Sequence, residues 1–409
     1  MVFSKISVVG LGYIGLPTAA MFSSKKVKVV GVDVSPYVVQ TINNGEIHIV
    51  EPGLDLIVKK ATEDGFLKAT LVPELADAFL IAVPTPFKAD NHEPDISFIE
   101  SATKAIAPLL KRGDLVILES TSPVGTTEKM ASWMAEARPD LSFPQQNGEG
   151  SDIRVAHCPE RVLPGHILRE LVQNDRIIGG MTSKCAELAE SLYKVFVEGD
   201  CVTTDARTAE MVKLTENSFR DVNIAFANEL SIVCDNLSID VSRLIALANL
   251  HPRVSILNPG PGVGGHCISV DPWFLIHSAP SQSKLITAAR AVNDGKPEWV
   301  LDKVMEIIQE RNLKHIVCMG LAYKPDVDDF RESPALKIFE ALSLRADGFV
   351  VSAVEPYLPA SHPQTGKLIN VSDIPKANSL IVGLVAHSIF KDMNLGENVV
   401  VDFANVWNK

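Results

Sequence analysis

The sequence lacks the features of a disulfide-rich, zinc-binding or secreted protein. Its six cysteines include no CxxC pair and follow no regular spacing, which argues against structural zinc and against a disulfide framework. We therefore expect no metal site, and a reducing compartment fits this cysteine usage. Any one of the cysteines is by default a small buried hydrophobic side chain.

Long apolar runs and an excess of positive charge are also missing. The most apolar stretch near the N-terminus, residues 6–22, contains three glycines and a proline and is too short to span a bilayer. The net charge of -12 disfavours nucleic acid and anionic membranes, so a phosphate-bearing ligand must be held by local donors. We expect a cytoplasmic protein that binds no nucleic acid and inserts into no membrane.

The first part of the chain follows the order of a parallel sheet. A chain of 409 residues without low-complexity tracts should form roughly two to three domains. A strand, a glycine-rich turn, a helix and a second strand open the sequence, and further buried strands follow. The expected strands are residues 6–9, 28–32, 79–83, 115–119 and 155–158, and the first helix is residues 13–23.

The rest of the chain changes to helices and then returns to an α/β order. Residues 204–237 contain no Gly or Pro and predict one long helix, followed by a Pro- and Gly-rich loop at 252–265. Helices are expected at 285–292, 298–309 and 335–344, with strands at 315–319, 349–354, 380–384 and 399–403. The turn at 320–325 lacks a three-glycine pattern, so it should bind something other than a second dinucleotide.

These patterns predict the fold class and the domains. The fold should be α/β, with two Rossmann-like doubly wound domains joined by a central all-helical region that contains a long helix. A helical segment of this kind is suited to joining domains or subunits. The expected domains are residues 1–203, 204–297 and 298–409.

A glycine-rich turn carries the clearest ligand signal. Gly10, Gly12 and Gly15 follow the first strand and open a helix, so they allow a tight turn, close approach of a pyrophosphate and close helix packing. Asp33 ends the next strand, where a carboxylate binds ribose hydroxyls and repels a 2′-phosphate. The pattern predicts NAD rather than NADP, the alternative being a glycine-rich turn that binds nothing.

Polar side chains at two other places could serve the same site. Thr85 and Thr121 follow strands of the first sheet, whose carboxyl ends face the ligand crevice, although each could simply cap a turn. On the long helix, Lys213, Asn217 and Arg220 fall at i, i+4 and i+7 and share one face. Such a stripe could stabilise an oxyanion, or it could be an ordinary solvent-exposed stripe.

Cys267 is the most informative cysteine. It follows Gly264 and Gly265, which allow backbone N–H groups and substrate to approach closely and so favour a thiolate. Hydride cannot leave a free aldehyde directly to give an acid, so a thiolate beside a nicotinamide indicates aldehyde oxidation through a thiohemiacetal and a thioester. Asp271 could take part or could merely cap a helix, and His266 is given no role because neighbouring loop residues often point apart.

Four motifs together resemble a known family. They are NPGPGVGGHC at residues 258–267, HPRV at 251–254, CPERVLPG at 158–165 and NSFRDVN at 217–223. With these motifs the chain resembles the UDP-glucose/GDP-mannose dehydrogenase family over nearly its whole length. Within that family it looks like the branch that oxidises UDP-N-acetyl-D-mannosamine.

This resemblance implies a function. The N-terminal domain would bind NAD, the central helices would form a homodimer, and the C-terminal domain would help hold the nucleotide diphosphate of a UDP-sugar. The C6 hydroxyl of the sugar would be oxidised by four electrons to a carboxylate, with two NAD+ reduced. The epimer of the acetamido sugar stays open, and so does any assembly beyond a dimer.

The resemblance also implies roles for matching residues. The catalytic set would be the nucleophile Cys267, the oxyanion stabilisers Lys213 and Asn217, the water-ordering pair Asp271 and Thr121, and the hydrolytic carboxylate Glu160. The cofactor would be bound by Gly10, Gly12, Tyr13, Ile14, Gly15, Asp33, Thr85 and Thr121. The substrate would be bound by Glu160, Arg161, Val162, Lys213, Asn217, Arg220, His251, Arg253, Gly264, Lys324 and Arg331, with Arg253 reaching across the subunit interface.

One departure from the UDP-glucose branch affects the expected site. Where those enzymes have a second glutamate, this chain has Pro164, so hydrolysis shared by two glutamates is not assumed. We hypothesise that Arg161 and Arg220, which replace less charged residues of that branch, accommodate the 2-acetamido group or fix the sugar. Two rival functions are a two-electron dehydrogenase of hydroxy acids and a nucleotide-binding protein without turnover.

Overall fold

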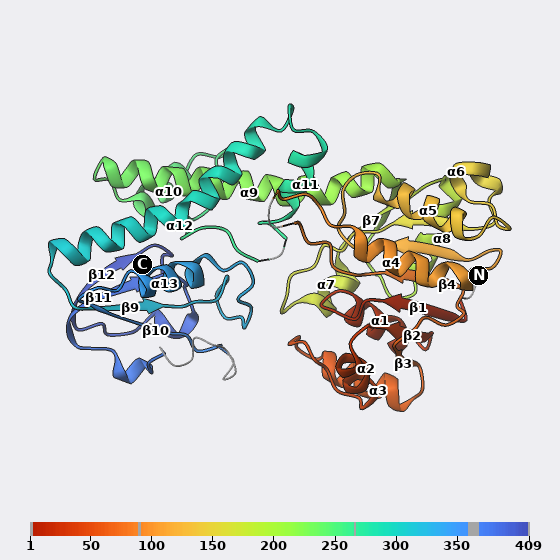
Figure 1. Ribbon diagram of the computed structural model, residues 1–409, viewed down its shortest axis with the longest axis horizontal. Helices are drawn as coiled ribbons and strands as arrows, with labels where there is room; N and C mark the ends of the chain where they lie inside the picture. The colour runs from red at the N-terminus through yellow and green to blue at the C-terminus, as the bar shows by residue number, and fades with distance from the viewer. Residues whose placement is uncertain (1–2, 89–90, 266, 359–367, 408–409) are drawn as a thin grey trace. The chain divides into compact units, whose positions relative to one another are not determined.

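The computed structural model describes residues 3–88, 91–265, 267–358 and 368–407. The chain forms two compact units, residues 1–215 and 216–409. The boundary falls inside the long helix α9 (Ala206–Asn236), which confirms the single helix expected over residues 204–237 (Figure 1). Within the described ranges, no helix is both long enough and apolar enough to cross a membrane.

An eight-stranded sheet forms the centre of the first unit. Its strand order is β3-β2-β1-β4-β5-β6-β7-β8, and the first six strands in that list have the order of a dinucleotide-binding fold, with a switch point between β1 and β4. All neighbouring strands are parallel except β6 and β7. The strands are β1 (Lys5–Val9), β2 (Lys28–Val32), β3 (Leu67–Thr70), β4 (Ala78–Ile81), β5 (Leu115–Leu118), β6 (Arg154–His157), β7 (Arg176–Gly180) and β8 (Cys201–Asp205).

Every strand predicted for this unit is present, and three more strands were not predicted. The additional strands are β3, β7 and β8, with the sequences LKAT, RIIGG and CVTTD. They contain polar residues or glycine, and most of β8 is exposed or half-buried. Such strands lack the continuous apolar run by which a buried parallel strand is recognised.

Helices cover both faces of this sheet (Figure 1). Ile6 and Val8 of β1 pack into a core with α1, α3 and α8, whereas Val9 and Phe79 pack into a second core with α4 and α5. Successive strand side chains point to opposite faces, so a fully buried strand needs both faces covered. The helices are α1 (Gly15–Ser24), α2 (Pro36–Asn43), α3 (Leu54–Glu63), α4 (Ser97–Ile106), α5 (Thr126–Ala137), α6 (Pro144–Asn147), α7 (Ile167–Gln173) and α8 (Ser183–Tyr193).

The second unit contains α10 (Val241–Ala248), α11 (Asp271–Ser278) and α12 (Lys284–Glu310). The sequence predicts two separate helices, residues 285–292 before Pro297 and residues 298–309 after it. This prediction is wrong, because α12 continues through the proline. Proline removes one backbone hydrogen bond and usually ends or kinks a helix, so other contacts must hold the chain helical here.

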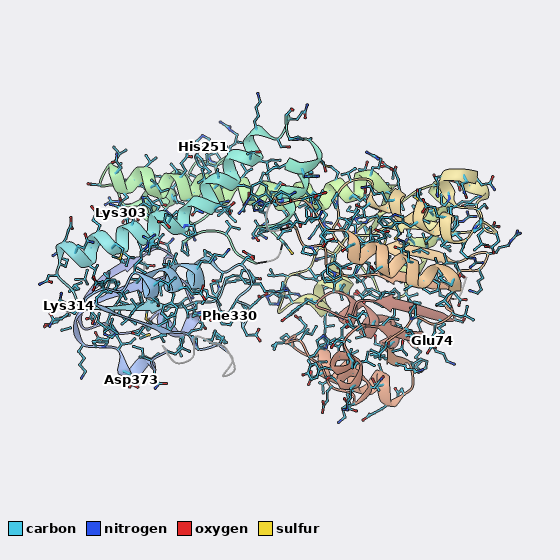
Figure 2. The ribbon with its side chains drawn as sticks, in the orientation of Figure 1. Glu74, His251, Lys303, Lys314, Phe330 and Asp373 are labelled. Carbon is cyan, nitrogen blue, oxygen red and sulfur yellow. The ribbon has the colours of Figure 1, made fainter. Side chains whose placement is uncertain are left out.

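Contacts of the residues around Pro297 explain this continuity. Lys296 is buried, donates to the Ser231 hydroxyl at 2.5 Å and lies 3.8 Å from the centre of the Trp299 ring. Further along α12, Lys303, labelled in Figure 2, pairs with Asp235 of α9 at 3.0 Å. These contacts fix both halves of α12 against α9 and offset the lost hydrogen bond. Burial lowers the pKa of Lys296 to about 7.

A four-stranded parallel sheet with the order β10-β9-β11-β12 completes the second unit. Ile316 and Cys318 of β9 pack against α12 and α13 (Pro334–Leu344), whereas Val317 and Met319 pack on the opposite face with Phe390. The strands are β9 (His315–Met319), β10 (Val350–Val354), β11 (Ala377–Gly383) and β12 (Glu397–Asp402). The expected fold class, with two Rossmann-like parallel sheets separated along the chain by a helical region, is confirmed.

Candidate functional site

Close backbone contacts shape the glycine-rich turn after β1. Gly10 has a φ of +93°, and a Cβ on it would lie 2.6 Å from the Ala82 carbonyl oxygen. A Cβ on Gly15 would lie 1.8 Å from the Gly10 carbonyl oxygen, whereas one on Gly12 would meet no described atom within 4 Å. Packing therefore requires glycine at two positions. The open space at the third position fits the close approach of a pyrophosphate.

Asp33 directly follows β2 and supports the same turn. Its Oδ2 accepts the Leu11 N–H at 3.0 Å, and its Oδ1 accepts the Ser35 N–H at 2.9 Å. A carboxylate offers about four acceptor positions, so the half-buried Asp33 keeps acceptors for ribose hydroxyls. Tyr13 and Ile14, in the turn itself, are half-buried. The residues present therefore fit NAD, with the turn for the pyrophosphate and Asp33 for a ribose.

The two threonines expected near the cofactor are in contact. Thr85 follows β4, Thr121 follows β5, and the Thr85 hydroxyl donates to the Thr121 carbonyl oxygen at 2.5 Å. The Ser120 hydroxyl donates to the Val83 carbonyl oxygen at 2.6 Å and ties the same two strand ends together. The Thr85 side chain thus bridges two loops at the ligand-facing edge of the sheet instead of capping its own turn.

Glu210 of α9 holds the segment that follows Thr121, and it was not predicted as a site residue. Its carboxylate accepts the Gly125 N–H at 2.6 Å and the N–H and hydroxyl of Thr127 at 2.8 and 2.6 Å. These groups lie at the start of α5, where unpaired N–H groups attract a carboxylate. Lys213 lies about one turn after Glu210 on α9. The hydrogen bonds of Glu210 therefore fix the backbone at Lys213 relative to the segment that follows Thr121.

The polar stripe of α9 is only partly exposed. Lys213 is half-buried, Asn217 is buried and Arg220 is exposed. The alternative of an ordinary solvated stripe is wrong for Asn217, because its Nδ2 donates to Asp271 Oδ2 at 2.5 Å. This bond brings together two predicted catalytic residues that lie 54 positions apart in the sequence.

Asp271 is the first residue of α11. The cap position is Val270, so the alternative that Asp271 merely caps the helix is wrong. The Cys267 carbonyl oxygen accepts the N–H groups of Val270 and Asp271 at 3.0 and 2.8 Å, which ties the cysteine to the helix start. Cys267 and Cys201 are half-buried, and the other four cysteines are buried.

The glycines before Cys267 allow a close approach to another loop of the same unit. A Cβ on Gly264 would lie 2.8 Å from the Glu332 carbonyl oxygen, and one on Gly265 would lie 2.8 Å from the Tyr323 ring. The Gly265 N–H donates to the Arg331 carbonyl oxygen at 3.0 Å. The cysteine loop therefore contacts the segment after β9 that carries a predicted substrate residue.

Other predicted substrate residues of this unit lie in loops. His251 and Arg253 are exposed in the segment after α10, where Figure 2 labels His251. Lys324 is half-buried in the segment after β9, and Arg331 is exposed. His266, to which no role is assigned, lies outside the described residues.

Glu160 belongs to a buried charge cluster in the first unit. It is 7% exposed, and its Oε1 pairs with the guanidinium of Arg176, which is 5% exposed. Arg176 also lies 4.3 Å from the centre of the Tyr193 ring and donates to Cys158 Sγ at 3.5 Å. A second carboxylate, Glu119, accepts the Tyr193 hydroxyl at 2.6 Å. Arg176 and Glu119 were not predicted, because their partners are distant in the sequence.

Two carboxylates in this cluster interact electrostatically with one guanidinium, and one of them, Glu160, forms the ion pair with it. Burial and the negative charge of Glu160 raise the pKa of Glu119 to about 8. The uncharged form of Glu119 is therefore favoured in the fold, while Glu160 pairs with Arg176. Protonation of one carboxylate avoids the cost of a second buried negative charge.

Arg161 and Val162 connect this cluster to the surface. With Glu160 and Arg176 they line a small pocket of about 10 Å³. Arg161 donates from Nη1 to the Asp175 carbonyl oxygen at 3.2 Å, and Val162 packs against the first core. Glu160 thus reaches a surface pocket although most of its side chain is buried.

A larger pocket of about 170 Å³ lies in the second unit. Its walls include residues 259–262, Ala322, Tyr323 and Pro325 of the turn after β9, and the segment 384–386 after β11. Strands β9 and β11 flank a switch point of this sheet, and α/β domains bind ligands outside the carboxyl ends of strands at such points. The pocket therefore has the position of a ligand site of the C-terminal domain.

Three family models match successive parts of the chain. The NAD binding domain of the UDP-glucose/GDP-mannose dehydrogenase family matches residues 4–197. The central domain of the same family matches residues 207–295, and its UDP binding domain matches residues 317–409.

Similar proteins match along almost the whole chain. The UDP-N-acetyl-D-mannosamine dehydrogenase of Campylobacter jejuni is 60% identical over 95% of this chain and 96% of its own length. The NDP-N-acetyl-D-galactosaminuronic acid dehydrogenase of Ralstonia nicotianae is 57% identical over 99% of this chain and 97% of its own length. The native structure of the UDP-N-acetyl-mannosamine dehydrogenase from Staphylococcus aureus is 42% identical with a TM-score of 0.88, over 99% of this chain and 96% of that chain.

Replacing Glu119 by Gln should make the protein less sensitive to alkaline pH. The pKa of Glu119 is raised in the folded state from 4.5 to about 8, so the folded protein binds more protons than the unfolded chain between these values. Stability is then lost as the pH rises through this window, by at most about 1.4 kcal/mol per pH unit. Because Gln is neutral and can still accept the Tyr193 hydroxyl, the melting temperature of Glu119→Gln relative to wild type should increase from pH 5 to pH 8.

The surface variant Glu63→Gln is the matched control for this measurement and should show no such trend. A melting-temperature difference between Glu119→Gln and wild type that stays constant from pH 5 to pH 8 would contradict a protonated Glu119.

Proposed function

Because the chain belongs to the UDP-glucose/GDP-mannose dehydrogenase family, we propose that it oxidises the C6 hydroxyl of UDP-N-acetyl-D-mannosamine to a carboxylate. The observation that carries this proposal is the cysteine loop, which Asp271 and Gly265 hold by backbone hydrogen bonds. The oxidation removes four electrons, so each sugar consumes two NAD+ and one water.

The first unit supplies the residues that would hold NAD. Gly10, Gly12 and Gly15 receive the pyrophosphate, Asp33 binds a ribose, and Thr121, with Thr85 bonded to its carbonyl oxygen, lines the crevice at the strand ends. When bound, NAD+ accepts the hydride in each of the two oxidations. Tyr13 and Ile14 complete the turn around the cofactor.

Cys267 is the proposed nucleophile. Its thiolate adds to the aldehyde carbon left by the first oxidation, and the new C–S bond creates an oxyanion. Asn217 binds Asp271 through its amide nitrogen, which still has a second N–H for that oxyanion. Lys213, one turn earlier on α9, adds a positive charge.

Water completes the reaction by cleaving the thioester. The water oxygen bonds to the carbonyl carbon, the C–S bond breaks, and Cys267 leaves as a thiolate. We assign Asp271 and Thr121 to the ordering of this water and Glu160 to the acceptance of its proton. The chain has Pro164 in place of a second glutamate, so Glu160 is the carboxylate to which this step is assigned.

The substrate would be held by residues from several loops. Lys324 and Arg331 of the UDP binding domain belong to the segment that contacts the cysteine loop, and Gly264 allows that contact. Arg161 and Arg220 are assigned to the acetamido group of the sugar, with Val162 beside Arg161. An N-acetylgalactosamine substrate is the second candidate, because the similar protein of Ralstonia nicotianae is named an NDP-N-acetyl-D-galactosaminuronic acid dehydrogenase.

A homodimer through the central helices is part of the proposal. The side chains of Phe219, Phe226 and Val233 on α9 are 68%, 52% and 45% exposed. They recur every seven residues, so they form one apolar stripe on the helix. A second copy of the chain that covers this stripe would remove it from water, and we assign His251 and Arg253 to substrate contacts near that interface.

The proposed domains are an NAD-binding domain at residues 1–203, a helical dimerisation domain at 204–297 and a UDP-sugar-binding domain at 298–409. The matching family segments support this division, because each lies within one proposed domain.

Incubation with NAD+ and a panel of UDP-N-acetylhexosamines, followed by mass spectrometry of the products, identifies the sugar that is oxidised.

Replacing Cys267 by Ala should stop oxidation at the aldehyde, because no thiohemiacetal can form. We expect one NADH per sugar in place of two, and a loss of uronate formation of roughly a thousandfold or more. Cys267→Ser should accumulate an ester, since an alkoxide leaves less readily than a thiolate. The control is Cys201→Ala, at the other half-buried cysteine, which should keep two NADH per sugar. Uronate release by Cys267→Ala at the normal rate would exclude covalent catalysis.

Replacing Arg220 by Ala should weaken use of the acetamido sugar while UDP binding stays unchanged. Loss of a hydrogen bond from a charged donor predicts a fall in kcat/KM of roughly 10- to 100-fold. Steady-state kinetics with the UDP-sugar and calorimetric titration with UDP alone measure the two effects. Unchanged kinetic constants remove Arg220 from sugar recognition.

Replacing Phe226 by Glu should convert the dimer to a monomer, because it places a charge in the centre of the apolar stripe. Light scattering after gel filtration measures the mass. Phe98→Glu is the matched control, at a phenylalanine of α4 that is 47% exposed, and should keep the mass of wild type. A wild-type protein that is already monomeric would refute the dimer.

A further inference from the structure

A buried carboxylate in the second unit occupies the place that Asp33 has in the first. Glu355 follows β10, and its Oε2 accepts the N–H groups of Leu321 and Ala322 at 2.6 and 3.0 Å in the turn after β9. Its Oε1 accepts the Tyr357 N–H at 2.8 Å. Each Rossmann-like sheet therefore uses an acidic residue after its second strand to hold the turn after its first strand.

His387 provides a further donor to this carboxylate. The His387 side chain is fully buried in the segment after β11, and its Nε2 lies 3.1 Å from Glu355 Oε2. Its Nδ1 accepts the Asp326 N–H at 2.9 Å. Because Nδ1 accepts a backbone N–H, Nε2 is left as the donor of the ring and donates to Glu355. Burial alone would raise the pKa of Glu355, but the hydrogen bonds from His387 and the backbone outweigh it and lower the pKa.

Asp326 receives further bonds from the segment of His387. Its carboxylate accepts the Ser388 N–H at 2.9 Å and the Ser388 hydroxyl at 2.5 Å. Asp326 has a φ of +59°, a conformation that Asp tolerates better than most residues but that needs support from its surroundings. The chain around Asp326 is thus tied to the segment after β11 by backbone and side-chain bonds.

These bonds join two walls of the 170 Å³ pocket. Ala322, Tyr323 and Pro325 form one wall and residues 384–386 form another, and Asp326 and His387 lie directly after these walls in the sequence. Lys324 lies between Tyr323 and Pro325 in the segment that forms the first wall. A change in the bond between Asp326 and His387 would therefore alter the spacing of the two walls.

We propose that His387 is a positioning residue of the nucleotide pocket, which holds the segment around Lys324 against residues 384–386 by accepting the Asp326 N–H. It acts through Asp326 and Glu355 and does not touch the nucleotide. The inference rests on the proposed function only in taking UDP as the ligand of this pocket.

The same bonds distinguish Glu355 from the corresponding acid of the first sheet. Glu355 accepts four N–H groups, from Leu321, Ala322, Tyr357 and His387. Three of these bonds go to Oε2 and one to Oε1, so most of its about four acceptor positions are occupied. Asp33 accepts only two N–H groups from the described residues. The acid of the second sheet is thus used to hold the walls of a pocket.

Two substitutions separate the bonds of His387. In His387→Asn, the side-chain oxygen takes the place of Nδ1 and can accept the Asp326 N–H. In His387→Gln, the amide nitrogen takes the place of Nε2 and can donate to Glu355, but the Asp326 N–H loses its partner. The comparison of these variants isolates the bond to Asp326, because both remove the ring.

Calorimetric titration of the full chain with UDP tests the proposal. His387→Gln should bind UDP roughly 5- to 100-fold more weakly than wild type, because a buried donor is left unpaired. His387→Asn should stay within about threefold of wild type, and both variants should bind NAD+ as wild type does. In kinetics, His387→Gln should raise KM for the UDP-sugar with little change in kcat. Ser388→Ala, which removes one bond to Asp326, is a milder variant and should weaken UDP binding in the same direction.

Three results would overturn the role of His387. The first is equal UDP affinity of wild type, His387→Gln and Ser388→Ala. The second is an equal loss of UDP affinity in the Asn and Gln variants, which would indicate a general packing role. The third is a wild-type protein that does not bind UDP, which would also overturn the proposed function; the first two leave that function intact.

Discussion

The hydrogen bond from Asn217 to Asp271 is the contact on which the proposed chemistry depends. It joins the middle of α9 to the first residue of α11, and the Asp271 N–H in turn binds the Cys267 carbonyl oxygen. On its other side the cysteine loop packs through Gly265 against the Tyr323 ring. A long helix, a helix start and a domain surface thus hold the backbone at Cys267, as the proposed covalent mechanism requires of its nucleophile.

The two Rossmann-like sheets show how one fold can serve two ligands. Both carry an acidic residue after the second strand, and both use it to hold the turn after the first strand. Asp33 is half-buried and accepts two N–H groups of the described residues, whereas Glu355 is buried and accepts four, from the backbone and His387. The same position in the two sheets therefore carries carboxylates that differ in burial and in hydrogen bonding.

Local sequence patterns predict much of this molecule. The glycine turn, the long helix α9 and the glycines before Cys267 can be recognised from local patterns, and the fold class follows from such patterns. The contacts that require several of these glycines nevertheless come from distant residues such as Ala82 and Tyr323. Contacts between distant segments could not be predicted in this way. Glu210 binds the start of α5 across more than 80 residues, and Arg176 pairs with Glu160 from a strand that has no clear apolar run. The helix through Pro297 likewise depends on tertiary packing, which overrides a local breaking signal.

The central claim is that sulfur bonds to C6 of the sugar during turnover. The most direct measurement is mass spectrometry of the peptide that contains Cys267, prepared from wild-type enzyme quenched rapidly during turnover with NAD+ and UDP-N-acetyl-D-mannosamine. The account predicts that a fraction of this peptide carries the mass of the bound UDP-sugar as a thioester. An unmodified Cys267 peptide at every quench time, while the uronate accumulates, would contradict it.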